Sequence, residues 1–212
     1  TYVLENHDRT RSLSRVGGDL AKARVLATML CTLRGVPVVY QGQEIGMTNR
    51  YIPLREADDP IPGLLARRLP EAVNRRLPER LNRDEVRTPM QWTAAPGVGF
   101  CPDDVAPWLP VNDNRSERNV ADQSGDPSSL LSLYRTLLAL RAASPALSGS
   151  SLHIVDSDAE EVLAYERSDG EERLLVVANL GARGAEHTIT GGADIVVATD
   201  PSITVRVAGG SR

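Results

Sequence analysis

A histidine and an aspartate stand together near the start of the chain, at His7 and Asp8, just after a short apolar run. Such a pair can act as a catalytic pair, although on a loop it more often forms a satisfied surface hydrogen bond. The run over residues 2–5 predicts a buried strand that ends in this polar cluster. Polar groups gathered at a strand end indicate a site, and Arg9 and Arg11 are expected to be salt-bridge partners that hold the loop.

The pattern that follows predicts the elements that support this loop. Asp19 can cap a helix with apolar residues at helical spacing over residues 19–34, and Gly35 supplies a stop. A second strand is predicted over residues 36–40. Strand, helix and strand form a βαβ unit with a right-handed crossover, which predicts an α/β barrel or a doubly wound sheet. Polar clusters at the C-terminal ends of barrel strands usually belong to active sites, which favours a functional role for the polar pair.

Between residues 48 and 127 the periodicity fails and loop-forming residues dominate. So long a loop in a compact domain is usually functional or disordered. Its large aromatic residues predict that it is ordered, and these are Trp92, Phe100 and Trp108. One or two short helices, broken by prolines, are predicted over residues 64–81.

The rest of the chain changes from helical to strand patterning. Asp126 and Pro127 form an N-cap and first-turn pair for a helix over residues 127–142, which ends before Pro145. After Gly149, short runs rich in Val, Ile, Leu and Thr predict strands at residues 152–155, 162–166, 174–179, 188–189, 195–198 and 203–207. These strands fit a small antiparallel all-β domain. We therefore predict two domains, residues 1–147 and residues 148–212.

Composition narrows the classes of partner. The chain has 212 residues, a formal net charge of -4 and a sequence pI near 5.5, which argues against a nucleic-acid or anionic-membrane partner. No apolar stretch approaches the roughly 20 residues that a membrane helix needs. Thr1 is preceded by neither an initiator Met nor a leader, so the chain is expected to begin in mid-protein. Cys31 and Cys101 lack metal-ligand spacing and are expected to be free thiols of a cytoplasmic protein, without a metal or cofactor.

Three blocks of sequence carry a resemblance to a known family. Leu4–Arg11 resembles the Asn-His-Asp motif that closes the seventh strand of α-amylase superfamily barrels, and Gly35–Met47 is similar to the eighth strand and its loop. Asn82–Trp92, followed by Pro107–Asn112, resembles the α-glucosidase and oligo-1,6-glucosidase branch. The resemblance implies the C-terminal part of a (β/α)8 TIM barrel, with strands 7 and 8 and the last helix, followed by the β-rich domain.

The chemistry that this resemblance implies is retaining glycoside hydrolysis, which uses a carboxylate nucleophile and a carboxylic acid as proton donor. Asp8 matches the third carboxylate of the family, which grips hydroxyl groups of the reacting sugar. His7 is expected to donate a hydrogen bond to the same ring, and Arg87 to reach it from the loop after strand eight and orient Asp8. The nucleophile and proton donor are expected upstream of Thr1, so the chain alone is expected to be inactive.

Structural roles are predicted for the remaining polar and aromatic residues of these blocks. Asn6 is expected to hydrogen-bond its loop, Gln41 and Glu44 to connect strand eight to its neighbours, and Arg83 to pair with Asp84. Tyr40 is expected in the core. Trp92 and Trp108 could stack on sugar rings, but tryptophans of a Pro-rich loop more often anchor it in the core.

Three functions fit these residues. The first is a C-terminal fragment of an exo-acting α-glucosidase that hydrolyses terminal α-linked glucose from short oligosaccharides, with the missing N-terminal part of the same barrel as its partner. A transglucosidase, such as trehalose synthase or sucrose hydrolase, shares the motifs. The third is a non-catalytic, α-amylase-like binding or subunit module, against which the joint presence of Asn6, His7, Asp8 and Arg87 argues. Two strands alone would leave an open sheet edge, so the isolated fragment is expected to be unstable or self-associating.

Overall fold

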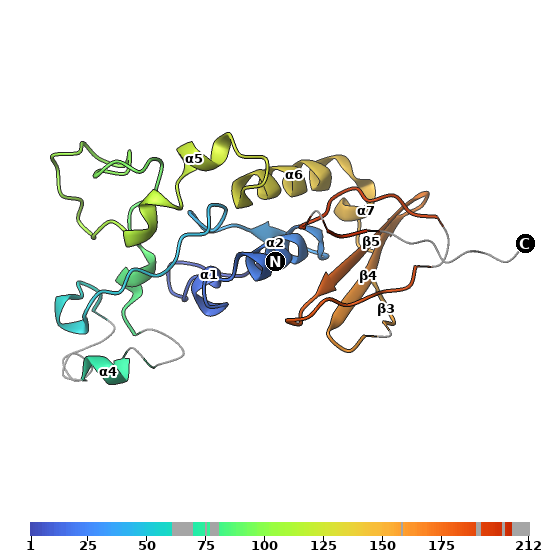
Figure 1. The fold of residues 1–212 in the computed structure, drawn as a ribbon, viewed down its shortest axis with the longest axis horizontal. Coiled ribbons are helices and arrows are strands. Elements are labelled where there is room, and N and C mark those ends of the chain that lie inside the picture. Colours follow the sequence, from blue (N-terminus) through green and yellow to red (C-terminus); the bar gives the residue numbers. More distant parts are fainter. Residues whose placement is uncertain are drawn as a thin grey trace, which may run out of the picture. The chain divides into compact units, whose positions relative to one another are not determined.

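The computed structural model describes residues 1–60, 70–74, 76, 81–157, 159–189, 192–200 and 202–204. The chain forms two compact units, and Figure 1 labels the helices and the strands β3, β4 and β5. We call the first the loop unit, which consists of Val3–Leu20 and Val38–Ser132. The second is the sheet unit, which consists of Thr1–Tyr2, Ala21–Pro37 and Leu133–Arg212. The predicted domain boundary between residues 147 and 148 stays a prediction.

Two short strands lie where strands were predicted. β1 (Tyr2–Val3) and β2 (Pro37–Val38) are hydrogen-bonded neighbours in a two-stranded sheet. Both strands are shorter than predicted, because the backbone groups beyond them have other partners. The Leu4 carbonyl accepts a hydrogen bond from the Arg15 guanidinium, and the Tyr40 carbonyl accepts the Gln43 N–H at 2.9 Å in a turn.

The predicted helix between the two strands is present as α2 (Leu20–Thr32). Its buried residues recur at helical spacing, and they are Ala23, Ala27, Leu30, Cys31 and Thr32. α2 ends at Thr32, two residues before the predicted bound, and Gly35 follows it with a φ of 129°, a conformation that side-chain-bearing residues rarely adopt. A four-residue helix that the sequence pattern did not predict, α1 (Ser12–Arg15), precedes α2.

Short helical turns order the described parts of the long loop. They are the 3₁₀ turns η1 (Leu54–Glu56), η2 (Arg83–Val86) and η3 (Asp113–Ser116) and the helices α4 (Glu71–Asn74) and α5 (Val120–Ser124). Asparagine side chains cap η2, η3 and α5, each by accepting a backbone N–H of the first turn. Most of the helices predicted over residues 64–81 lie outside the described residues.

The clearest predicted helix begins later than expected. α6 spans Leu130–Ala143, followed by the short helix α7 (Pro145–Ser148). The Ser129 hydroxyl accepts the Ser132 N–H at 3.1 Å and so caps α6. The Asp126 carboxylate accepts the Ser128 N–H at 2.8 Å, so the predicted cap serves the preceding turn. None of the helices in the described ranges combines the length and apolar character that a membrane-spanning helix needs.

Three antiparallel strands form the sheet at the C-terminal side of the chain (Figure 1). They are β3 (His153–Val155), β4 (Val162–Asp169) and β5 (Glu172–Asn179), in the order β3-β4-β5. The first three predicted strands of the tail are therefore confirmed. Strands at residues 188–189 and 195–198 were predicted wrongly, and Ile195 and Val196 are exposed, so their apolar pattern has no core face to cover. Residues 203–204 are not a strand, and residues 205–207 lie outside the described residues.

Candidate functional site

The three residues predicted to form a site converge on the carboxylate of Asp8. Arg87 donates a hydrogen bond from Nη2 to Asp8 Oδ1 at 2.9 Å, and His7 Nε2 lies 3.2 Å from Asp8 Oδ2. Arg83, which was not predicted here, also donates to Oδ1, from Nη1 at 2.9 Å. The Asp8 side chain remains 44% exposed, so a ligand can reach it. Partial desolvation opposes ionisation of Asp8, but Arg83, His7 and Arg87 outweigh it and hold its pKa below the usual value.

The loop that carries Asp8 is fixed by its neighbours. The Asn6 side chain accepts the backbone N–H of Asp8 at 2.8 Å, which confirms the predicted role of Asn6. Arg87 donates from Nε to the His7 carbonyl at 2.9 Å in addition to its bond with Asp8. One guanidinium therefore binds both the backbone of this loop and the side chain of Asp8.

Arg83 is held by an aspartate far from it in the sequence. Its Nε and Nη2 donate to the two carboxylate oxygens of Asp59 at 2.8 and 2.7 Å. The predicted pair of Arg83 with Asp84 is wrong, because the Asp84 carboxylate instead accepts the backbone N–H groups of Asp58 and Asp59. Asp84 fixes the loop, which leaves Arg83 to pair with Asp59 and Asp8. The available signal for Arg83 was its place in the same motif block as Arg87, within Asn82–Trp92.

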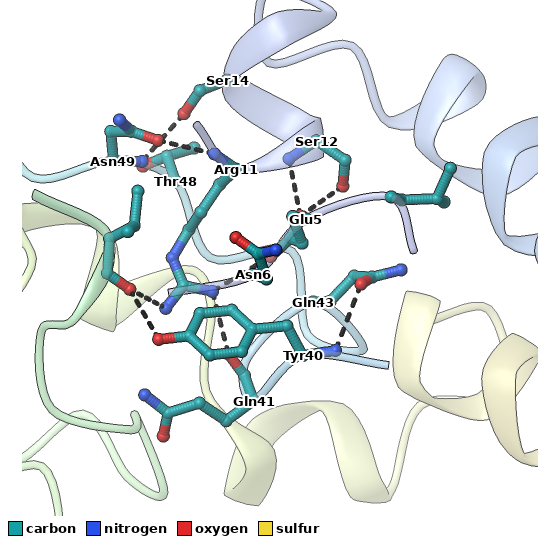
Figure 2. Close-up of polar contacts among 12 residues, drawn as sticks. Glu5, Asn6, Arg11, Ser12, Ser14, Tyr40, Gln41, Gln43, Thr48 and Asn49 are labelled. Carbon is teal, nitrogen blue, oxygen red and sulfur yellow. Dashed lines mark hydrogen bonds and ion pairs between the residues drawn. The ribbon is translucent and has the colours of Figure 1, made fainter. Parts of the chain in front are cut away.

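A buried ion pair joins Glu5 to Arg11 (Figure 2), which stand on either side of His7 and Asp8 in the sequence. Arg11 is fully buried and donates to Glu5 Oε1 at 3.2 Å, while Glu5 Oε2 accepts the backbone N–H of Ser12. Arg11 also donates to the carbonyls of Gln41 and Val86 at 2.8 and 2.9 Å. The prediction that Arg11 holds the loop is confirmed.

Through its hydrogen bonds, Arg11 connects the segments that contain Glu5, Gln41 and Val86. The Val86 carbonyl precedes Arg87 directly, so Arg11 fixes the backbone from which Arg87 projects. The Arg11 guanidinium lies 5.0 Å from the ring centroid of Tyr40, which is partly buried beneath it (Figure 2). Burial lowers the pKa of Arg11, and the charge of Glu5 opposes that change. The pair is thus a structural element that aligns Arg87.

The loop tryptophans are not the hydrophobic anchors that the sequence predicted. Trp108 is 76% exposed, and its indole N–H donates to Asp58 Oδ2 at 3.0 Å. Trp92 and Phe100 are also exposed, whereas the neighbour of Trp108, Leu109, is buried. The apolar anchor of this motif is therefore the leucine, because the chain turns the indole ring outward. Stacking of these rings on a sugar stays a prediction.

The groups around Asp8 suit a neutral, hydroxyl-rich ligand. The carboxylate can accept hydrogen bonds from hydroxyl groups, and the guanidinium and imidazole groups can donate to them. Within the described ranges, His, Cys, Asp and Glu side chains do not gather in threes in a way that could hold a metal ion. The arrangement is a polar cluster with one ionised carboxylate at its centre.

Comparison with known proteins finds a family model and curated relatives that match most of the chain. The family model described as "Alpha amylase, catalytic domain" matches residues 1–150. The oligo-1,6-glucosidase of Halalkalibacterium halodurans is 37% identical over 84% of this chain and 33% of its own length. The glucan 1,6-alpha-glucosidase of Streptococcus dysgalactiae subsp. equisimilis is 38% identical over 87% of this chain and 38% of its own length. The chain thus spans about a third of the length of the curated relatives it matches.

Solved structures of sucrose-related synthases share the fold. The trehalulose synthase MutB from Pseudomonas mesoacidophila MX-45 superimposes with a TM-score of 0.74 at 38% identity, over 86% of this chain and 34% of the synthase. A variant of the isomaltulose synthase from Erwinia rhapontici NX5, solved in complex with sucrose, gives a TM-score of 0.71 at 35% identity, over 84% and 34% of the two chains. The similarity therefore extends to the arrangement of the elements.

Proposed function

We propose that this chain, which belongs to the alpha-amylase family of catalytic domains, is the C-terminal part of a retaining α-glucosidase. The parent enzyme hydrolyses terminal α-linked glucose from short oligosaccharides. The observation that carries this proposal is the convergence of His7, Arg83 and Arg87 on one exposed, ionised carboxylate, Asp8. The names of the relatives, which include oligo-1,6-glucosidase and glucan 1,6-alpha-glucosidase, support the choice of substrate.

Each residue of this cluster has a defined role in the proposal. Asp8 accepts hydrogen bonds from hydroxyl groups of the reacting glucose, and its negative charge favours the oxocarbenium-like transition state over the neutral substrate. Arg87 orients Asp8 and donates to sugar oxygens, and His7 donates to a hydroxyl of the same ring. The lowered pKa of Asp8 keeps this carboxylate ionised at neutral pH, as the role requires.

The remaining catalytic groups come, in this proposal, from an N-terminal part of the same barrel. Retaining hydrolysis needs a nucleophilic carboxylate and a proton donor, and a covalent glycosyl-enzyme intermediate forms on the nucleophile. Apolar side chains on and beside β1 and β2 support a further covering part, since Tyr2, Val3, Val36 and Val38 are all exposed. Both cysteines are free, which supports the cytoplasmic location that we propose.

A transglucosidase is the second candidate, favoured by the similarity to trehalulose and isomaltulose synthases. Such an enzyme uses the same cluster but passes the glucosyl group to an acceptor other than water. Incubating the parent protein separately with isomaltose and with sucrose separates the two, because hydrolysis releases free glucose whereas isomerisation yields a new disaccharide.

Turnover of a chromogenic aryl α-glucoside tests the proposal. The full-length protein that contains this chain is expected to release the chromophore, and residues 1–212 alone are expected to release none. A full-length protein that binds α-glucosides without converting them would support a binding module instead. Turnover by residues 1–212 alone would show that the chemistry has been misplaced.

A further inference from the structure

We propose that Trp108 is a stacking platform for a glucosyl unit of the leaving group, and that Asp58 holds its indole ring in place. This inference rests on the function proposed above and adds to it a residue that recognises the length of the substrate. In an exo-acting α-glucosidase the reacting glucose is the terminal unit, so every further sugar lies on the leaving-group side of the bond that breaks. A platform outside the cluster around Asp8 therefore meets leaving-group sugars.

The indole ring of Trp108 is both exposed and held in one orientation. It is 76% exposed, and its Nε1 donates a hydrogen bond to Asp58 Oδ2 at 3.0 Å. Pro107 precedes it, and Leu109, which is buried, anchors the backbone directly after it. Because proline restricts the backbone and the hydrogen bond orients the ring, little freedom remains to be lost when a ligand stacks on the indole.

The ring is connected to the Asp8 carboxylate through two consecutive residues. Asp58 accepts the indole N–H, whereas the carboxylate of the next residue, Asp59, binds Arg83. Arg83 in turn donates to Asp8 Oδ1 at 2.9 Å. Consecutive Cα atoms lie about 3.8 Å apart, so one short segment leads to Trp108 on one side and to Asp8 on the other. This places the platform within a few side-chain lengths of the reacting glucose, which an oligosaccharide can span.

The surroundings of the ring favour a sugar as its occupant. A hexose presents C–H groups on its faces and hydroxyl groups around its rim, so it suits an aromatic face beside a polar group. Trp108 supplies the face, and the exposed Asp58 carboxylate can accept hydrogen bonds from the rim hydroxyls. A protein segment packed over the ring would instead bury a charge that is bonded to a neutral indole, which is costly.

Steady-state kinetics of the full-length protein with two kinds of substrate test the platform. α-Glucosyl fluoride carries the reacting glucose without a leaving-group sugar, whereas isomaltotriose and maltotriose carry two further glucosyl units. Trp108→Ala is expected to lower the ratio of kcat/KM for the better trisaccharide to kcat/KM for the fluoride about 3- to 10-fold, the effect of one aromatic contact. The loss should lie in KM, because stacking binds substrate and transition state equally. An unchanged ratio would overturn the inference.

Variants at Asp58 and Trp92 separate positioning of the ring from a general loss of exposed aromatic surface. Asp58→Ala frees the indole and should lower the same ratio about 2- to 5-fold, whereas Asp58→Asn, which keeps an acceptor oxygen, should restore most of it. Trp92 is the matched control, because it is an exposed tryptophan of the same loop whose backbone pairs with Val98 and Ala121. Trp92→Ala should leave the ratio unchanged within error, and an equal fall in this variant would contradict the role of Trp108.

Crystals of the full-length Asp8→Asn protein soaked with the trisaccharide give a readout that does not depend on turnover. A glucosyl ring is expected to lie face to face with the indole of Trp108. A trisaccharide whose leaving-group sugars lie away from this ring would overturn the inference and leave the proposed function standing. Absence of α-glucosyl fluoride turnover by the wild-type protein would instead overturn the proposed function, and this inference with it.

Discussion

Arg83 and Arg87, which contact Asp8, use the arginine side chain in a different way from Arg167. In the loop unit, the side chains of Arg83 and Arg87 are about a quarter exposed, at 22% and 24%, and meet on a carboxylate that is open to solvent. In the sheet unit, Arg167 is fully buried and donates to the backbone carbonyls of Thr32, Leu147, Gly149 and Ser151. An arginine whose donors end on backbone carbonyls serves folding, whereas one that orients an exposed carboxylate can serve a ligand.

Arg141, which also lies in the sheet unit, likewise binds backbone carbonyls. It donates to the carbonyls of Cys31 and Leu33 at 2.8 and 3.1 Å and to that of Gly35. The last carbonyls of a helix have no partner inside the helix, so Arg141 and Arg167 together complete the C-terminal end of α2. Both arginines follow α2 by more than a hundred positions, and they thereby attach α6 and β4 to this helix.

The largest effect on stability is expected at Arg167. Arg167→Met leaves several buried carbonyls without a donor, and each such group carries its own desolvation cost. The free energy of unfolding of the full-length protein should fall by about 3–5 kcal/mol, as when a buried polar network is broken. Chemical denaturation measures this, and kcat of the folded protein should stay within about twofold. A large loss of kcat with unchanged stability would break the comparison.

A substitution in the buried pair of Glu5 and Arg11 should lower both the stability and the turnover of the protein. Glu5→Gln removes the charge that compensates Arg11 and should lower the free energy of unfolding by about 3 kcal/mol. Because Arg11 also holds the Val86 carbonyl next to Arg87, kcat should fall as well, by less than about tenfold. Denaturation curves and turnover numbers on the same preparation measure the two effects. Unchanged stability would show that the pair is dispensable.

A smaller effect is expected from Cys31, which Arg141 faces at the end of α2. Burial raises the pKa of this thiol to about 11, opposed by the charge of Arg141. The unfolded thiol ionises near pH 9 and the folded thiol does not, so stability is lost as the pH rises from about 9 to about 11. Wild type should lose on the order of 1 to 2 kcal/mol more than Cys31→Ala over that interval. Parallel pH profiles of the unfolding free energy would contradict this assignment.

The smallest effect is expected at the exposed ion pair between Arg173 and Glu166 on β5 and β4. The Arg173 side chain is largely in water, where a salt bridge contributes little. Arg173→Met should therefore leave both the thermal unfolding midpoint and kcat unchanged within error. A clear drop in the midpoint would show that exposure is a poor guide to the role of an arginine in this chain.

The sequence predicted elements and contacts that depend on local pattern. The apolar spacing of α2 and α6 carries its own signal, so these helices were placed within a few residues. The convergence of His7, Asp8 and Arg87 followed from the motif blocks. A family motif carries the spatial arrangement of its residues, which the spacing of those residues in the sequence does not give by itself.

The sequence did not predict contacts that depend on the path of the long loop. Arg83 was assigned to its neighbour Asp84, but the loop brings Asp59 to it from 24 positions away. A capping Asn82 and the turn η2 point the Asp84 carboxylate at backbone N–H groups instead. Trp108 was expected inside because tryptophans of a Pro-rich loop often anchor it, yet the residue type does not say which of two neighbours, Trp108 or Leu109, faces the core.

Turnover by Asp8→Asn in the full-length protein tests the central claim, that Asp8 supplies charge to an α-glucosidase site. Asn keeps the shape and some hydrogen bonding of Asp8 but removes the charge that favours the cationic transition state, so the effect should appear mainly in kcat. With a chromogenic aryl α-glucoside, kcat should fall on the order of 10²- to 10³-fold, with an unfolding midpoint close to that of wild type. A variant within a factor of a few of wild-type kcat would contradict the account.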